Sequence, residues 1–139
     1  MTAYKQIARK NLAIQMIEHL KKRNMEGYYC ETKKEALEKA ISFLPSQCSI
    51  SWGGSESLNE IGFMDYMKVH KDDYQIIDRF AGKTVEEKRE IYGKSTMADY
   101  YFMSANAITK DGIIVNMDGS GNRVACLCHG PNHVVLVIG

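Results

Sequence analysis

The predicted order of strands and helices is the feature that most constrains the fold of this chain. Short apolar runs with strand character, residues 48–52, 74–77 and 99–104, alternate with helical segments at residues 57–69 and 84–98. Strands that alternate with helices of these lengths pair in parallel and are joined by right-handed crossovers. The sequence therefore predicts an α/β fold built on a mostly parallel sheet.

The first third of the chain predicts two further helices and a small strand. Residues 3–24 carry a broad apolar stripe at helical spacing. Residues 27–30 are short and aromatic and predict a strand. A capping box at residues 32–35 opens the second helix, which Pro45 ends, and residues 84–87 repeat the capping-box pattern.

The alternation of predicted strands and helices ends after Ser104. Residues 107–115 predict two short strands joined by a turn, and residues 123–128 and 133–138 are further apolar, strand-like runs. In a wound sheet a strand is normally followed by the helix that covers it, but this chain ends at Gly139. We therefore expect that the natural domain is longer, or that the N-terminal helix or a second subunit, as in a homodimer, covers the last strand.

Length and charge restrict the class of protein. The chain has 139 residues, which predicts a single domain over residues 1–139. Its 18 basic and 17 acidic residues give a net charge of +1, which argues against a large nucleic-acid footprint or a polybasic membrane patch. Neither a signal sequence nor the ~20 apolar residues of a membrane span is apparent. We expect a cytoplasmic protein that binds neither nucleic acid nor membrane.

The four cysteines predict reduced, structural thiols. Cys30, Cys48, Cys126 and Cys128 form no recognisable disulfide framework, and three of them lie in strand-like apolar runs, where cysteine behaves as a small hydrophobe. A Cys-x-Cys pair on a strand would place both thiols of residues 126 and 128 on one face. Because no second ligand pair has zinc spacing, no metal site is predicted.

A glycine turn at residues 51–57 lies between a predicted strand and a predicted helix. Gly53 and Gly54 permit positive φ and close approach of a ligand to the main chain, while Ser55 and Ser57 can cap the helix. Free N–H groups at a helix start favour a phosphate or carboxylate. A tight turn with no ligand is the alternative, and Glu56 would repel an anion unless it points outward.

A second polar cluster lies between residues 104 and 131. Its short polar side chains and glycines partly reflect turn chemistry, but an acceptor, an amide and a guanidinium together suit a polar, anionic small molecule. Asp78 and Arg79 end a strand at the same predicted edge, where an ordinary surface ion pair is equally consistent. The ligand-binding candidates outside the glycine turn are Asp78, Asn106, Asp118, Gly119, Gly121, Asn122 and Arg123.

These segments resemble, in order and along essentially the whole chain, the LUD domain, a family named for lactate utilisation. The matching motifs are Ser51-Trp52-Gly53-Gly54-Ser55, Glu60-Ile61-Gly62, Asp78-Arg79, Ser104-Ala105-Asn106-Ala107-Ile108-Thr109, Asp111-Gly112, Asn116-Met117-Asp118-Gly119-Ser120-Gly121-Asn122-Arg123 and His129-Gly130-Pro131. The resemblance implies a Rossmann-like three-layer sandwich of the sugar-phosphate isomerase and CoA-transferase type, with a β-hairpin insertion. In that group the loop that matches Gly53-Gly54-Ser55 holds a phosphate.

The resemblance also implies a setting for the protein. Some LUD proteins accompany iron–sulfur subunits that oxidise lactate to pyruvate, and family members commonly continue past residues 134–139, some with a cysteine-rich tail. The resemblance identifies no cofactor, and a shared fold does not transfer a reaction.

Three functions remain open from the sequence. The leading interpretation is an accessory module of 2-hydroxy-acid metabolism that binds a small anionic or phosphorylated ligand. An isomerase or acyl-transfer enzyme would instead use Asp118 as general base or nucleophile, which requires a raised pKa for a base. The third is a structural subunit of a redox assembly.

Overall fold

A parallel sheet of four strands forms the centre of the molecule. The computed structural model describes residues 2–139. The strand order is β2-β1-β3-β6, and each neighbouring pair is parallel. The strands are β1 (Ser49–Trp52), β2 (Gln75–Ile76), β3 (Tyr100–Met103) and β6 (His133–Leu136).

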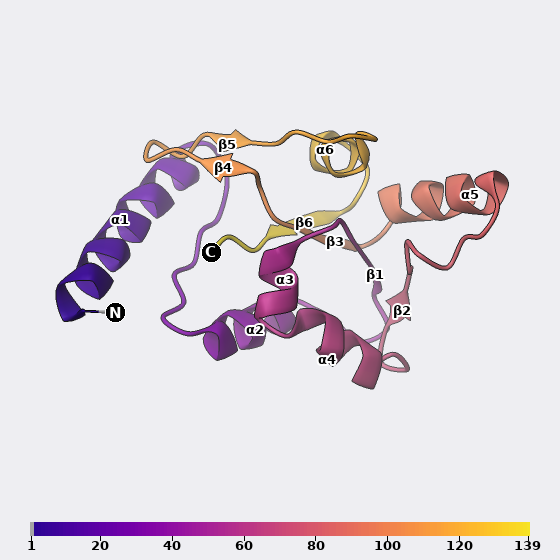
Figure 1. The fold of residues 1–139 in the computed structure, drawn as a ribbon, viewed down its shortest axis with the longest axis horizontal. Coiled ribbons are helices and arrows are strands. Elements are labelled where there is room, and N and C mark those ends of the chain that lie inside the picture. Colours follow the sequence, from indigo (N-terminus) through magenta and orange to yellow (C-terminus); the bar gives the residue numbers. More distant parts are fainter. Residues whose placement is uncertain (1) are drawn as a thin grey trace.

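Helices flank this sheet on both faces, which gives three layers (Figure 1). They are α1 (Ala3–Lys22), α2 (Lys33–Ser42), α3 (Glu56–Glu60), α4 (Phe63–Val69), α5 (Val85–Thr96) and α6 (Asn122–Cys128). Helices α2, α3 and α4 lie on one face of the sheet, and α5 and α6 lie on the other. The Rossmann-like α/β fold that the sequence predicts is confirmed.

The core is divided between the two faces because successive side chains of a strand point to opposite sides. Ile50 and Phe102 are fully buried against α2, α3 and α4, and the Phe102 ring lies 4.3 Å from the ring of Phe63. The other face holds a smaller cluster around Tyr101, Met103 and Cys126. The larger cluster therefore packs against β1 and β3, whereas the smaller cluster leaves space on the other face of the sheet, beside α5 and α6.

The hairpin insertion is also confirmed. β4 (Ala107–Ile108) and β5 (Ile114–Val115) pair antiparallel as a separate two-stranded sheet. Gly112 in the turn has φ +80°, and a Cβ at this position would lie 3.2 Å from the Cβ of His19. The Arg23 Nε donates to the Asp111 carbonyl at 3.4 Å, so the hairpin turn contacts the end of α1.

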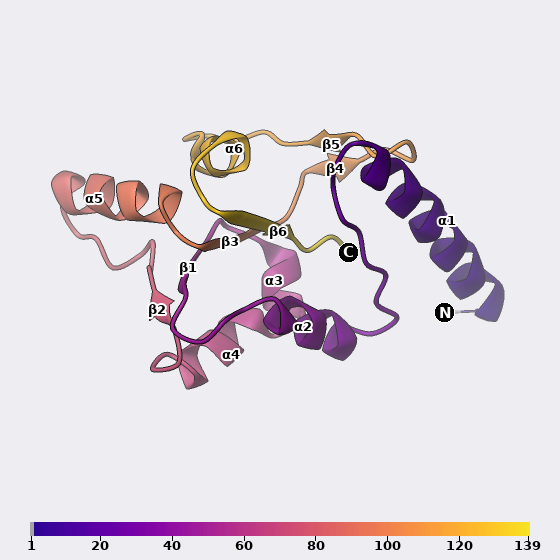
Figure 2. The same ribbon diagram turned by 180° about the vertical axis from the view of Figure 1, so that it is seen from behind.

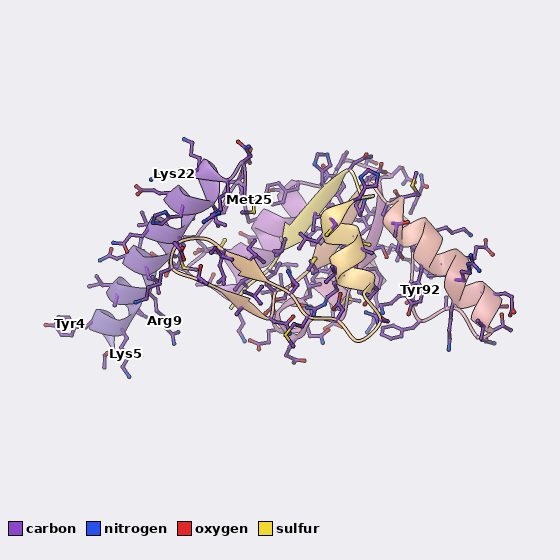
Figure 3. The ribbon with its side chains drawn as sticks, turned by 90° about the horizontal axis from the view of Figure 1, so that it is seen from above. Tyr4, Lys5, Arg9, Lys22, Met25 and Tyr92 are labelled. Carbon is purple, nitrogen blue, oxygen red and sulfur yellow. The ribbon has the colours of Figure 1, made fainter. Side chains whose placement is uncertain are left out.

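Helix α1 lies at one end of the molecule, beside the hairpin, in both ribbon views (Figure 2). None of its residues is buried, and Tyr4, Ile7 and Ile14 are exposed. Figure 3 shows the side chains of Tyr4, Lys5 and Arg9 projecting outward from this helix. The predicted helix is therefore confirmed, but it does not form part of the core.

Three local predictions are wrong. Residues 27–30 form no strand, because no strand of the sheet lies beside them to supply hydrogen bonds. The predicted helix over residues 57–69 is two helices, α3 and α4, because Gly62 at φ +81° interrupts it. Residues 123–128 belong to helix α6, so Cys126 is buried while Cys128 is exposed, and the two thiols do not share a face.

The structure confirms the predicted capping box of α5 and shows a modified one at α2. Thr84 and Glu87 form the predicted capping box of α5. At α2 the Thr32 hydroxyl accepts from the Glu35 N–H, but the Glu35 carboxylate accepts from the N–H of Glu31, one residue before the cap. All four cysteines are free; Cys48 and Cys126 are buried, whereas Cys128 is exposed.

Candidate functional site

The candidate site lies at the carboxyl edge of the sheet. Because β1, β2 and β3 are parallel, the segments that follow them, at Gly53, Asp78–Arg79 and Ser104, emerge at the same edge. The chain leaves β1 toward the α3 face and later enters α6 on the opposite face (Figure 1). A crevice between such strands is the usual ligand site of an open α/β sheet.

The side chain of Arg123 occupies the position between the two loops. A Cβ added at Gly53 would lie 2.6 Å from the Arg123 Cγ, 2.9 Å from its Cδ and 3.0 Å from the Tyr101 hydroxyl. Neither Gly53 nor Gly54 has a positive φ. Glycine is needed at residue 53 for this close approach of the arginine stem, and not for an unusual backbone conformation.

The Arg123 guanidinium is engaged by its own loop. Its Nε donates to the Asp118 carboxylate at 2.6 Å, and its Nη2 donates to the Asn106 Oδ1 and the Met117 carbonyl, both at 2.9 Å. Its Nη1 lies 3.4 Å from the Ser104 carbonyl oxygen. These contacts tie the end of β3, the polar loop and α6 together, and they bring Asn106, Asp118 and Arg123 into one cluster.

The carboxylate of Asp118 has two roles in this cluster. Its side chain is only 5% exposed, and besides pairing with Arg123 it accepts from the Val124 N–H at 2.7 Å in the first turn of α6. Burial alone raises the Asp118 pKa, but the Val124 and Arg123 hydrogen bonds outweigh burial and the net pKa is lowered. A general base working near neutral pH needs a raised pKa, so this carboxylate is arranged as a structural acceptor.

The glycine turn uses its own helix cap. The Ser55 hydroxyl accepts from the Leu58 N–H at 3.1 Å, which makes Ser55, and not Ser57, the N-cap of α3. The Gly53 N–H donates to the Phe102 carbonyl at 2.9 Å. Because α3 has only five residues and its cap is satisfied by Ser55, the helix dipole offers little to a ligand here.

A cleft of about 210 Å³ lies beside this cluster, on the α5 and α6 side of the sheet. The residues that line it come from β1, β3, α5, α6 and the loops after β2 and before α6. They are Trp52, Arg79, Tyr92, Ser95, Thr96, Tyr101, Ser120, Gly121, Asn122, Ala125 and Cys126. Figure 3 shows Tyr92 reaching from α5 toward α6. The cleft therefore contains Gly121 and Asn122 of the predicted site.

Arg79 is the charged side chain of this cleft, although only its neighbour Asp78 is among the ligand-binding residues predicted from the sequence. The Arg79 Nε is buried without a hydrogen-bond partner, and no carboxylate of residues 2–139 forms a salt bridge with its guanidinium. Its guanidinium lies 5.0 Å from the centre of the Phe80 ring. A Cβ at Gly54 would lie 3.5 Å from the Arg79 Nη1, so the glycine turn and this cation are neighbours.

The remaining predicted residues lie outside the lining of the cleft. The Asp78 side chain accepts from the Phe80 N–H at 2.9 Å, so it shapes the loop that carries Arg79 and forms no pair with it. Gly119 is exposed with nothing within 4 Å of a Cβ built there. These positions, and Ser57, belong to the same edge of the sheet but do not line the cleft.

The floor of the cleft carries two groups that titrate only at high pH. Burial raises the pKa of the Tyr101 hydroxyl, and the nearby Cys126 thiol raises it further, whereas Arg79 lowers it. Burial likewise raises the pKa of Cys126. A thiol in this state is a poor nucleophile. Within residues 2–139, His, Cys, Asp and Glu side chains nowhere gather into a group that could hold a metal ion.

A comparison with protein families identifies the family to which this chain belongs. Residues 14–139 match the model of the LUD domain. The chain belongs to the LUD domain family. The matched segment of this chain runs from the middle of α1 to the last residue, and it includes the glycine turn, the polar loop and the cleft. No curated protein and no solved structure was found to match the chain.

The family associates this LUD domain with lactate utilisation in general terms. None of the helices in residues 2–139 has the length and apolar character needed to cross a membrane. The LUD domain thus combines a Rossmann-like scaffold with an open cleft, beside the polar loop, whose charged group is a cation.

Proposed function

We propose that this LUD domain binds a small anionic molecule at Arg79 and serves as an accessory module of 2-hydroxy-acid utilisation. The observation that carries the proposal is the guanidinium of Arg79, which lines the cleft, has no carboxylate partner and leaves its buried Nε unsatisfied. A buried donor without an acceptor is unfavourable, and a bound carboxylate or phosphate would supply that acceptor.

The neighbouring backbone supports an anion at this place. Because Gly54 lacks a side chain, the space beside the Arg79 Nη1 is open on the side of the glycine turn. The amide of Asn122, which lines the same cleft, provides a neutral group for a hydroxyl or carbonyl of the ligand. In this proposal Arg79 holds the charge, and Gly54 and Asn122 form the adjacent surface.

The polar loop then acts by positioning the wall of the cleft. Arg123 and Asp118 fix the start of α6, and α6 supplies Asn122, Ala125 and Cys126 to the lining. Asn106 helps by accepting from the Arg123 Nη2. The proposal assigns the chemistry of lactate oxidation to partner subunits that carry iron–sulfur clusters, and binding to this domain.

The test compares Arg79→Gln with a matched control. Arg89 is an exposed cation on α5 outside the cleft, so Arg89→Gln removes the same charge without touching the site. Lactate, pyruvate, inorganic phosphate and ribose phosphate are titrated while the melting temperature is followed. We expect at least one of these anions to stabilise the wild type and Arg89→Gln but not Arg79→Gln. An equal response in all three proteins, or no response, would refute the proposal.

A further inference from the structure

The walls of the cleft beside Arg79 are unusually apolar for a site that holds an anion. Tyr101, 2% exposed, forms the floor next to the buried Cys126, whereas Trp52 reaches the cleft from the end of β1 with its side chain packed in the core of the opposite face. Tyr92 on α5, 39% exposed, and Ala125 on α6 form the mouth. Aromatic walls of this kind bury a large apolar area of a ligand.

The serine and threonine hydroxyls of the lining are already hydrogen-bonded within the protein. The Ser95 hydroxyl lies 2.8 Å from the Ser51 hydroxyl, and the Thr96 hydroxyl donates to the Gly93 carbonyl at 2.8 Å. The Ser120 hydroxyl donates to the Asn122 Oδ1 at 3.2 Å. A ligand with many hydroxyl groups, such as a phosphosugar, would therefore find few free partners and would lose hydrogen bonds to water.

The charge of the cleft is also small. Arg79 is the only charged side chain among the lining residues, and the Asn122 Nδ2 is the neutral donor that its contact with Ser120 leaves free. One guanidinium matches one carboxylate in a bidentate pair. A phosphate dianion would leave part of its charge uncompensated in these surroundings.

We propose that the cleft selects a carboxylic acid with a ring-sized apolar body, such as an aryl-substituted 2-hydroxy or 2-oxo acid. The inference rests on the proposed function, because it uses the same Arg79 for the carboxylate. The body lies between Tyr92 and Tyr101, against Ala125, and the Asn122 amide faces the substituent beside the carboxylate. Lactate itself would contact Arg79 but would leave the apolar walls of the cleft exposed to water.

The experiment measures binding of phenyllactate, lactate and ribose phosphate to the full chain by titration calorimetry. Because the phenyl ring would be buried, we expect phenyllactate to bind at least about tenfold more tightly than lactate. Ala125→Phe fills the mouth of the cleft without a change of charge and should weaken phenyllactate at least about tenfold. Ala8→Phe, at an exposed position of α1, is the matched control and should have no effect.

The outcomes separate this inference from the proposed function. Ribose phosphate that binds more tightly than phenyllactate, and only when Arg79 is present, would overturn the selectivity for apolar acids while leaving the anion site intact. Phenyllactate binding that needs Arg79 but is unchanged in Ala125→Phe would overturn the position of the apolar body. Absence of any binding that depends on Arg79 would overturn both.

Discussion

Two arginines lie at the same edge of the sheet, and their surroundings are opposite. Arg123 donates to the Asp118 carboxylate, the Asn106 amide and a backbone carbonyl, and its stem fills the space that Gly53 leaves. Arg79 lies beside Gly54 with an unsatisfied Nε and no carboxylate partner. The difference shows that a cation near a predicted ligand site can serve the fold or the ligand, and that its partners decide which.

The comparison extends to the two glycines of the turn. Gly53 is buried and touches the arginine that is fully engaged, whereas Gly54 is exposed and faces the arginine that is free. One Gly-Gly pair therefore has two physical functions. The first glycine admits a side chain of the protein, and the second leaves space on the solvent side of the cleft.

The largest expected effect is on folding stability at the Arg123 cluster. Asp118→Ala leaves a largely buried guanidinium without its carboxylate and removes the acceptor for the Val124 N–H, so we expect a loss of about 3 kcal/mol. Arg123→Met should lose a similar amount, and the double variant should lose less than the sum, because neither charge is then left alone. Urea unfolding followed by the fluorescence of Trp52, which is buried, measures these losses.

A surface pair provides the control for this measurement. Lys94 and Glu90 form an exposed pair at 2.8 Å on α5, and Glu90→Ala should change stability by no more than about 0.5 kcal/mol. A loss in Asp118→Ala as small as that in Glu90→Ala would show that the cluster does not hold the loop and α6 together.

The second prediction separates the two glycines. Gly53→Ala places a Cβ within 3 Å of the Arg123 stem, so the arginine must shift, and we expect a loss of about 1–3 kcal/mol. Gly54→Ala meets only the Arg79 Nη1 at 3.5 Å, an ordinary contact, and should change stability by less than about 0.5 kcal/mol. Equal losses in the same urea experiment would contradict the two roles assigned to the pair.

Much of the fold follows from the sequence, because its signals are local. The capping box at Thr84, the strand–helix alternation and the hairpin at residues 107–115 depend on neighbours within a few residues. Residues 123–128 were predicted wrongly because their apolar run suits a strand or a helix equally. The helix is decided by the left-handed Gly121, φ +75°, and by the Asp118 side chain that accepts from Val124.

The site was less predictable because its contacts join residues that are far apart in sequence. The sequence brings the glycine turn and the polar loop to one edge, but it does not show that the Arg123 side chain fills the space between them. It also gives Asp78 and Arg79 the appearance of an ion pair, whereas Asp78 binds the Phe80 N–H and leaves Arg79 free. Which charges pair is decided by contacts between residues far apart in sequence, such as Arg123 with Asn106.

The smallest expected effect on stability is at Arg79, and it completes the comparison. Arg79→Met keeps the length and apolar stem of the side chain but removes a guanidinium that has no carboxylate partner, so stability should change by less than about 0.5 kcal/mol, or rise slightly. Arg123→Met, the same substitution at the engaged arginine, is the matched contrast in the same urea experiment. If Arg79→Met destabilised the protein as much as Arg123→Met does, Arg79 would be a structural residue. Its unsatisfied Nε would then no longer indicate a ligand.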